Sequence, residues 1–159
     1  MADKLVLAAV DFSPVSAEVI ATASTLAEAV GAHLLLWHAV QLPSAIVSYE
    51  MAGENVAEFI AGAERDAEGR LGALARCVNT VPVECGCSSG VPAAEICLQA
   101  RDRGAGFVVV GSHGHGALYE FLIGTTTQGI LKDAPCPVVI VPAARPKAAR
   151  KYAVATEAQ

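Results

Sequence analysis

The sequence predicts an α/β fold: an open sheet of five parallel strands in the order 3-2-1-4-5, with helices on both faces. The main observation is that five short apolar runs alternate with four segments of helical character along the 159 residues. Right-handed crossovers between such strands build an open parallel sheet. A second observation concerns the first and fourth runs, which end in Asp11 and Gly111. If these strands are neighbours where the strand order reverses, both residues face the crevice in which such sheets bind ligands.

The first strand is predicted at residues 4–10 (KLVLAAV), an apolar run typical of a strand buried on both faces of a parallel sheet. Ser13 and Pro14 then predict the start of a helix, since serine is a favoured cap and proline suits the first helical position. This helix has one apolar face, and Gly31 ends it. The residues of the face recur at spacings of four, four, three and four: Val15, Val19, Ala23, Leu26 and Val30.

The second strand is predicted at His33–Val40 (HLLLWHAV), and the third at residues 80–87, where Pro82 indicates an edge strand. Between them, residues 41–53 show no clear period and are expected to form a loop near the carboxyl end of the sheet. Residues 54–78 are predicted as a long helix. Its buried side is expected to carry Val56, Ile60, Ala63, Ala67, Leu71 and Leu74.

The second half of the chain repeats the alternation. Gly90-Val91-Pro92 opens a helix that runs to Arg101, and residues 107–110 are predicted as the fourth strand. A glycine-rich segment follows, and then a helix near residues 125–132. The fifth strand is predicted at Val138–Val141, between two prolines.

Length and composition indicate one domain at residues 1–142, followed at 143–159 by a solvated tail that carries basic residues and no apolar face. Apolar residues make up 53% of the chain and charged residues 17%, so disorder is not expected. No apolar run approaches the roughly 20 residues of a membrane helix, and Asp11 interrupts the first run too soon for a secretory signal. A cytoplasmic protein without a membrane partner is therefore expected. The net charge of −5 disfavours an extended nucleic-acid surface.

The five cysteines are expected to be buried, reduced thiols, because their number is odd and the chain is not a small secreted scaffold. Cys85 and Cys87 are separated by one residue, and no CxxC or HxxxH partner accompanies them. The sequence therefore gives no support for a metal site made of protein side chains.

A glycine-rich segment is the most informative feature of the chain. Gly111, Gly114 and Gly116 follow the fourth strand, and Gly124 precedes three threonines at the start of the last helix. Glycine allows backbone N–H groups to approach a ligand closely, and the N-terminus of a helix attracts phosphate. The pattern Gly-x2-Gly-x9-Gly-Thr is neither a Walker loop nor a GxGxxG fingerprint, but it predicts a phosphate cradle.

In the order in which it occurs, this pattern resembles the nucleotide-binding branch of the universal stress protein family. The segment GSHGHGALYEFLIGTTTQGIL carries the spaced glycines, and CPVVIVP closes the match. The other matching pieces are Val10-Asp11-Phe12-Ser13 after the first strand, His38-Ala39-Val40 at the end of the second, and Gly90-x-Pro92 at the start of a helix. The resemblance covers about residues 4–142. It implies a Rossmann-like fold of the adenine nucleotide alpha hydrolase type.

The resemblance also implies a ligand, ATP or alternatively AMP or ADP, bound with Mg or Mn. In it, Asp11 lies by the adenosine, Val40 offers backbone groups to the adenine edge, and Gly111 lies against the ribose. His115 stands where relatives often carry a basic residue, and a neutral imidazole is a weaker charge partner for a triphosphate. The complete set of nucleotide-binding residues expected from the resemblance is Val10, Asp11, Ser13, Val40, Gly111, His113, Gly114, His115, Gly124, Thr125, Thr126 and Thr127.

Each of these residues has a simpler interpretation. Asp11 can cap the first helix, the glycines can serve turns alone, and the threonines can be ordinary hydroxyls at a helix start. Together, and at this spacing, they favour a ligand site. His33, His38 and Cys136 are expected to be structural.

The favoured function is a stress-response and signalling module that holds an adenine nucleotide and presents an altered surface to an unknown protein partner. No Ser-His-Asp or Cys-His arrangement is evident, so an enzyme is not favoured, but a slow ATPase or autophosphorylating enzyme is the alternative. A site for a cyclic nucleotide and a purely structural dimer with an empty crevice also stay open. Because an apolar edge strand is rarely left bare, Val138–Val141 is expected to pair with its copy in a homodimer, as the resemblance also implies.

Overall fold

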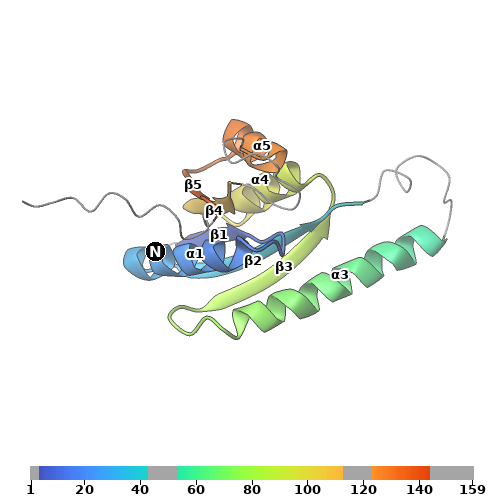
Figure 1. Ribbon diagram of the computed structural model, residues 1–159, viewed down its shortest axis with the longest axis horizontal. Helices are drawn as coiled ribbons and strands as arrows, with labels where there is room; N and C mark the ends of the chain where they lie inside the picture. The colour runs from blue at the N-terminus through green and yellow to red at the C-terminus, as the bar shows by residue number, and fades with distance from the viewer. Residues whose placement is uncertain (1–3, 43–53, 113–122, 144–159) are drawn as a thin grey trace, which may run out of the picture.

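The computed structural model describes residues 4–42, 54–112 and 123–143, and these residues form a five-stranded sheet flanked by helices (Figure 1). Every strand pair in the sheet is parallel, and the strand order is β3-β2-β1-β4-β5. The predicted fold class and strand order are thus confirmed. The strands are β1 (Leu5–Ala9), β2 (His33–Val40), β3 (Val83–Ser89), β4 (Phe107–Gly111) and β5 (Val138–Val141).

Among the described helices, two cover each face of the sheet (Figure 1). Helices α1 and α3 lie on one face, and α4 and α5 lie on the other. This division follows from right-handed crossovers. Helices α1 and α3 connect β1 to β2 and β2 to β3, in one direction across the sheet, whereas α4 and α5 connect β3 to β4 and β4 to β5, in the opposite direction. The helices are α1 (Ser16–Val30), α3 (Glu54–Ala75), α4 (Pro92–Asp102) and α5 (Thr125–Asp133).

The central strands are apolar throughout because both of their faces are covered. Side chains alternate along a strand, so Val6 packs toward α1 and α3 while its neighbour Leu7 packs toward α4 and α5. The same alternation holds in β2, where Leu34 and Leu36 face one core and Leu35 faces the other. All three of these leucines are fully buried.

Strands β1 and β4 are direct neighbours, as the sequence predicted. Leu7 lies opposite Val108, and Ala8 lies opposite Val109. From β1 the chain continues to β2 on one side, and from β4 it continues to β5 on the other side, so the strand order reverses between β1 and β4. The carboxyl ends of β1 and β4 therefore open between the two helical layers.

The edge position of β3 is also confirmed. Pro82 directly precedes the strand, and its carbonyl accepts the N–H of Leu34 at 2.9 Å. Next to this edge, the six-membered ring of the Trp37 indole contacts Gly86, and the indole donates its Nε1–H to Ser88 Oγ at 3.2 Å. A glycine is required at position 86 because any Cβ there would overlap the indole ring.

The start of α1 differs from its predicted position. The helix begins at Ser16, and Val15 rather than Ser13 occupies the position before it, so Pro14 lies in the preceding turn. The reason is Asp11, whose carboxylate accepts the N–H of Ser13 and so folds residues 11–15 into a turn of their own. Gly31 ends the helix in a left-handed conformation, φ 64°, as expected.

The cysteines are free thiols, but the prediction that they are buried is only partly correct. Cys97 is buried between α4 and α5, and its thiol lies 4.0 Å from the carbonyl oxygen of Ile130. Cys77 and Cys85 are exposed, because α3 ends before Cys77 and Cys85 lies on the edge strand. Within the parts of the chain that the structure describes, no helix has the length and apolar character needed to cross a membrane.

Candidate functional site

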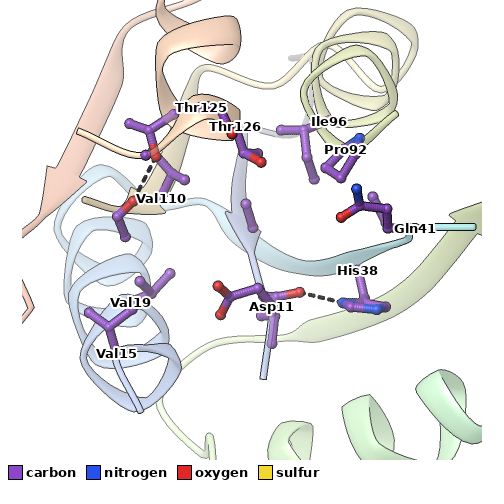
Figure 2. Close-up of a pocket in the computed structure, with 16 residues that line it drawn as sticks. Asp11, Val15, Val19, His38, Gln41, Pro92, Ile96, Val110, Thr125 and Thr126 are labelled. Carbon is purple, nitrogen blue, oxygen red and sulfur yellow. Dashed lines mark hydrogen bonds between the residues drawn. The ribbon is translucent and has the colours of Figure 1, made fainter. Parts of the chain in front are cut away.

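A pocket of about 450 Å³ lies at the carboxyl ends of β1, β2 and β4 (Figure 2). Helix α1 forms one side of it, and the first turns of α4 and α5 form the opposite side. The pocket thus occupies the place where the strand order reverses. Its lining residues are Ala9, Val10, Asp11, Val15, Val19, His38, Ala39, Gln41, Pro92, Ile96, Val110, Gly111, Gly124, Thr125, Thr126 and Thr127.

Asp11 is held in a fixed orientation at the end of β1. Its Oδ1 accepts the backbone N–H of Ser13 at 2.9 Å and the hydroxyl of Ser16 at 3.0 Å. Its Oδ2 makes no hydrogen bond with any of the described residues. A carboxylate with one oxygen anchored and the other unused is an acceptor oriented for a hydroxyl or amino group.

The turn after Asp11 contains a strained backbone. Phe12 has φ 60°, in the left-handed region that residues with a Cβ seldom adopt. Its ring contacts the imidazole of His38, with 4.5 Å between centroids, and the guanidinium of Arg70 lies 3.9 Å above its centroid. These contacts hold the turn against the sheet on one side and against α3 on the other.

His38 lines the pocket on the β2 side (Figure 2). Its Nδ1 lies 2.7 Å from the carbonyl oxygen of Val10, and a carbonyl only accepts, so Nδ1 carries the proton. In the neutral ring Nε2 is then an acceptor. The bond joins the ends of β1 and β2, which supports the prediction of a structural role for His38.

The first turn of α5 is anchored to the end of β4. Thr127, which is 3% exposed, donates its hydroxyl to the carbonyl of Gly111 at 2.8 Å. Gly124 donates its N–H to the carbonyl of Ser112 at 2.9 Å, and Ser112 donates its own N–H to Val141 at 2.7 Å. The helix start, β4 and β5 are therefore tied together at the pocket.

This anchoring leaves hydrogen-bond donors at the start of α5. The N–H groups of the first residues of a helix have no partner within it. Those of Thr125, Thr126 and Thr127 make no hydrogen bond to any other described residue, and neither do the hydroxyls of Thr125 and Thr126. Together with the positive end of the helix dipole, they form an environment suited to an anion.

The walls between these two polar ends are apolar. On one side the apolar wall consists of Val15, directly before α1, and Val19 within it; on the other side it consists of Pro92 and Ile96 of α4 (Figure 2). Gln41 adds an amide at the rim beside Pro92 (Figure 2). An apolar middle with a few convergent polar groups is typical of small-molecule sites.

Charge is sparse in the pocket. Among its described lining residues, Asp11 is the one acidic side chain and no lysine or arginine is present. No group of three or more metal-ligating side chains occurs within residues 4–42, 54–112 and 123–143.

The structure brings together seven of the residues that the sequence predicted for the site: Val10, Asp11, Gly111, Gly124, Thr125, Thr126 and Thr127. Ser13 and Val40 do not line the pocket. Ser13 instead orients Asp11 through its N–H, and the carbonyl of Val40 accepts the N–H of Gly90 at 3.0 Å. His113, Gly114 and His115 lie outside the described residues.

Sequence reasoning missed several lining residues. Pro92 and Ile96 were assigned to a helix but not to the site, and Gln41 was assigned to a loop. A usable signal existed for Gln41, which follows the carboxyl end of β2, the direct neighbour of β1. Pro92 and Ile96 follow the edge strand β3, and they line the pocket because α4 leads from β3 to β4. Ser16 had no such signal, since its role depends on the turn that Asp11 creates.

Comparison with known proteins gives a consistent result. The model of the universal stress protein family matches residues 4–142. A universal stress protein of Thermus aquaticus is 31% identical over 139 residues, which cover 87% of this chain and 98% of that protein. A shorter segment of 52 residues is 38% identical to the universal stress protein MJ0577 of Methanocaldococcus jannaschii, spanning 33% of this chain and 32% of the relative.

Solved structures show the same fold. The structure of MJ0577 has a TM-score of 0.74 and 24% identity, covering 92% of this chain and all of that one. A universal stress protein in complex with cAMP has a TM-score of 0.59 and 20% identity, covering 89% and 98%. A family member from Arabidopsis thaliana with AMP bound has a TM-score of 0.57 and 17% identity, covering 87% and 91%. With the family model and the relative from Thermus, these findings show that the chain belongs to the universal stress protein family.

Proposed function

We propose that the protein binds an adenine nucleotide in this pocket and acts as a stress-response and signalling module. The observation that carries the proposal is the pocket at the β1–β4 reversal, with unused amide and hydroxyl donors of α5 on one side and the anchored carboxylate of Asp11 on the other. Family members bound to AMP and to cAMP support an adenine-containing ligand.

The charges of the two sides determine the orientation of the ligand. Phosphate is attracted to the start of α5, where partial positive charge and N–H donors gather. Asp11 repels phosphate but accepts hydrogen bonds from hydroxyl and amino groups. The nucleoside therefore lies toward Asp11 and the apolar walls, while the phosphate lies toward Thr125 and Thr126.

The proposed contact residues follow from this orientation. Val10, Asp11 and Gly111 border the nucleoside, and Gly124, Thr125 and Thr126 border the phosphate. Thr127 and Ser13 act indirectly, since one anchors α5 and the other orients Asp11. Backbone contacts from Val40, and the roles of His113, Gly114 and His115, stay predictions from the sequence.

A homodimer through β5 belongs to the same proposal. This strand is four residues long, lies at the end of the sheet and carries only valine and isoleucine. Three of its side chains are partly exposed. Pairing with a second copy would cover this apolar edge. Light scattering on the full chain at tens of micromolar tests the pairing; a monomeric mass there would contradict it.

Mass analysis of the small molecules released from the purified, denatured protein tests the proposed ligand. We expect an adenine nucleotide at a substantial molar ratio in the wild-type protein, and a strongly reduced ratio in Asp11→Ala. Asp133→Ala is the matched control, because it removes the same charge from the far end of α5. Absence of any nucleotide, together with no heat of binding when ATP, AMP or cAMP is titrated in, would refute the proposal. Turnover of ATP with Mg or Mn would favour the slow ATPase instead.

A further inference from the structure

We infer that this pocket favours a nucleotide with a single phosphate group over a triphosphate. The inference rests on the proposed function and specifies the ligand class of that same site. Its basis is the number and kind of groups that can balance phosphate charge at the start of α5. The relevant groups are the backbone and side chains of Thr125, Thr126 and Thr127.

The donors at the start of α5 match one phosphate. Three N–H groups, those of Thr125, Thr126 and Thr127, have no partner among the described residues, and a phosphate monoester has three terminal oxygens. The hydroxyls of Thr125 and Thr126 add two donors, whereas the hydroxyl proton of Thr127 is already given to Gly111. The helix dipole contributes about half an elementary charge, which offsets part of one phosphate.

Among the described residues, a second and a third phosphate would find no cationic side chain to balance their charge. The described pocket walls hold no lysine or arginine. The sequence adds none between Gly111 and Thr125, although two histidines occur there. Phosphate groups in proteins are commonly paired with arginine or lysine, and an unpaired buried charge is costly. Each added phosphate thus brings charge without a new partner.

The position of Asp11 strengthens this preference. Its carboxylate lies on the α1 side of the pocket, across from Thr125 and Thr126 (Figure 2). A longer phosphate chain must extend toward solvent or toward this carboxylate, which repels it. Magnesium, which binds phosphate oxygens and one or two carboxylates, would reduce the penalty, so the preference is largest when no divalent cation is present.

Calorimetric titration of the nucleotide-free full chain with adenosine, AMP, cAMP, ADP and ATP tests this inference. The measurements are made in EDTA at pH 8, where an ordinary histidine, with a pKa of about 6.5, is neutral. We expect AMP to bind roughly tenfold more tightly than ATP, with Mg narrowing the gap. The cAMP titration distinguishes a monoester from a cyclic diester, which has fewer terminal oxygens and is expected to bind less tightly than AMP.

Thr126→Lys supplies the missing cation at the pocket, and Ala29→Lys, at an exposed position late in α1, supplies the same charge away from it. We expect the first variant to shift the ATP-to-AMP affinity ratio toward ATP by about tenfold and the second to leave it unchanged. An ATP affinity equal to or above that of AMP in EDTA overturns the inference and leaves the proposed function intact. Binding of none of the five compounds refutes both.

Discussion

The hydroxyl of Thr127 donates to the carbonyl oxygen of Gly111 at 2.8 Å, and this bond joins the start of α5 to the end of β4. Both residues line the pocket, and the threonine side chain is buried. The bond therefore fixes the anion-attracting end of a helix against the strand at which the sheet reverses. Several properties of the site depend on such fixed relationships.

Thr127→Val preserves the shape of the side chain and removes the bond. The carbonyl of Gly111 then loses a hydrogen-bond partner in a partly buried place, which is expected to lower the free energy of unfolding by about 1–2 kcal/mol. Nucleotide affinity should fall as well, because α5 is no longer tied to β4. Urea unfolding and calorimetry measure the two effects. Thr25→Val is the control, since its hydroxyl bonds to Ala21 on the exposed side of α1; an equal loss there would contradict the account.

Ser16→Ala removes the hydroxyl that holds Asp11 Oδ1 at 3.0 Å. The carboxylate keeps only the N–H of Ser13, so we expect nucleotide affinity to drop by roughly three- to tenfold, about one hydrogen bond to a charged group. Ser24→Ala in the same helix is the comparison. Its hydroxyl is buried without a described partner, so its removal should leave affinity unchanged and stability equal or higher. Unaltered affinity in Ser16→Ala would show that the orientation of Asp11 does not matter.

Gly86→Ala is expected to be strongly destabilising. An added Cβ would lie 2.8 Å from Cε3 of Trp37, and the indole cannot move away without losing its bond to Ser88. Overpacking of this kind costs about 1–3 kcal/mol. Gly69→Ala in α3, where an added Cβ meets nothing within 4 Å, should instead stabilise by about 0.5–1 kcal/mol. Thermal unfolding of the two variants compares them directly, and a stable Gly86→Ala protein would contradict the packing described for Trp37.

The buried thiol between α4 and α5 predicts a loss of stability at high pH. Burial raises the pKa of Cys97 above its ordinary value, and the negative charge of Asp133 adds to the shift. The folded state therefore keeps this proton at a pH where the unfolded chain releases it, so stability is full below the ordinary thiol pKa and falls as pH rises past it. Urea unfolding at pH 8 and pH 10 measures this fall, which should be smaller in Cys97→Ala. An equal fall in both proteins would assign it to other groups.

Much of the fold could be predicted because its signals are local. Each of these signals depends on a few neighbouring residues. The apolar run at His33–Val40 predicted β2, Pro82 predicted that β3 is an edge strand, and Gly31 predicted the end of α1, and the structure confirms all three. The neighbouring positions of β1 and β4 followed from chirality and from the residues at their ends.

The remaining features depend on individual contacts, some of them between distant segments and others within a single turn. The left-handed backbone of Phe12 is supported by His38 and Arg70, which lie far away in the sequence. The late start of α1 depends on a hydrogen bond of Asp11, and no pattern of apolar residues reports it. The three threonines of α5 look alike in the sequence. In the structure, however, the hydroxyl of Thr127 bonds to Gly111, whereas the hydroxyls of Thr125 and Thr126 have no described partner and can contact a ligand.

The central claim is that the start of α5 holds the phosphate of an adenine nucleotide. Backbone amide NMR of the full chain during titration with AMP measures this most directly. We expect the largest, saturable changes at the amides of Thr125, Thr126 and Thr127, with smaller ones around Asp11, and none of comparable size along β3 at the distant edge. Saturable changes that leave these three amides unaffected would contradict the account.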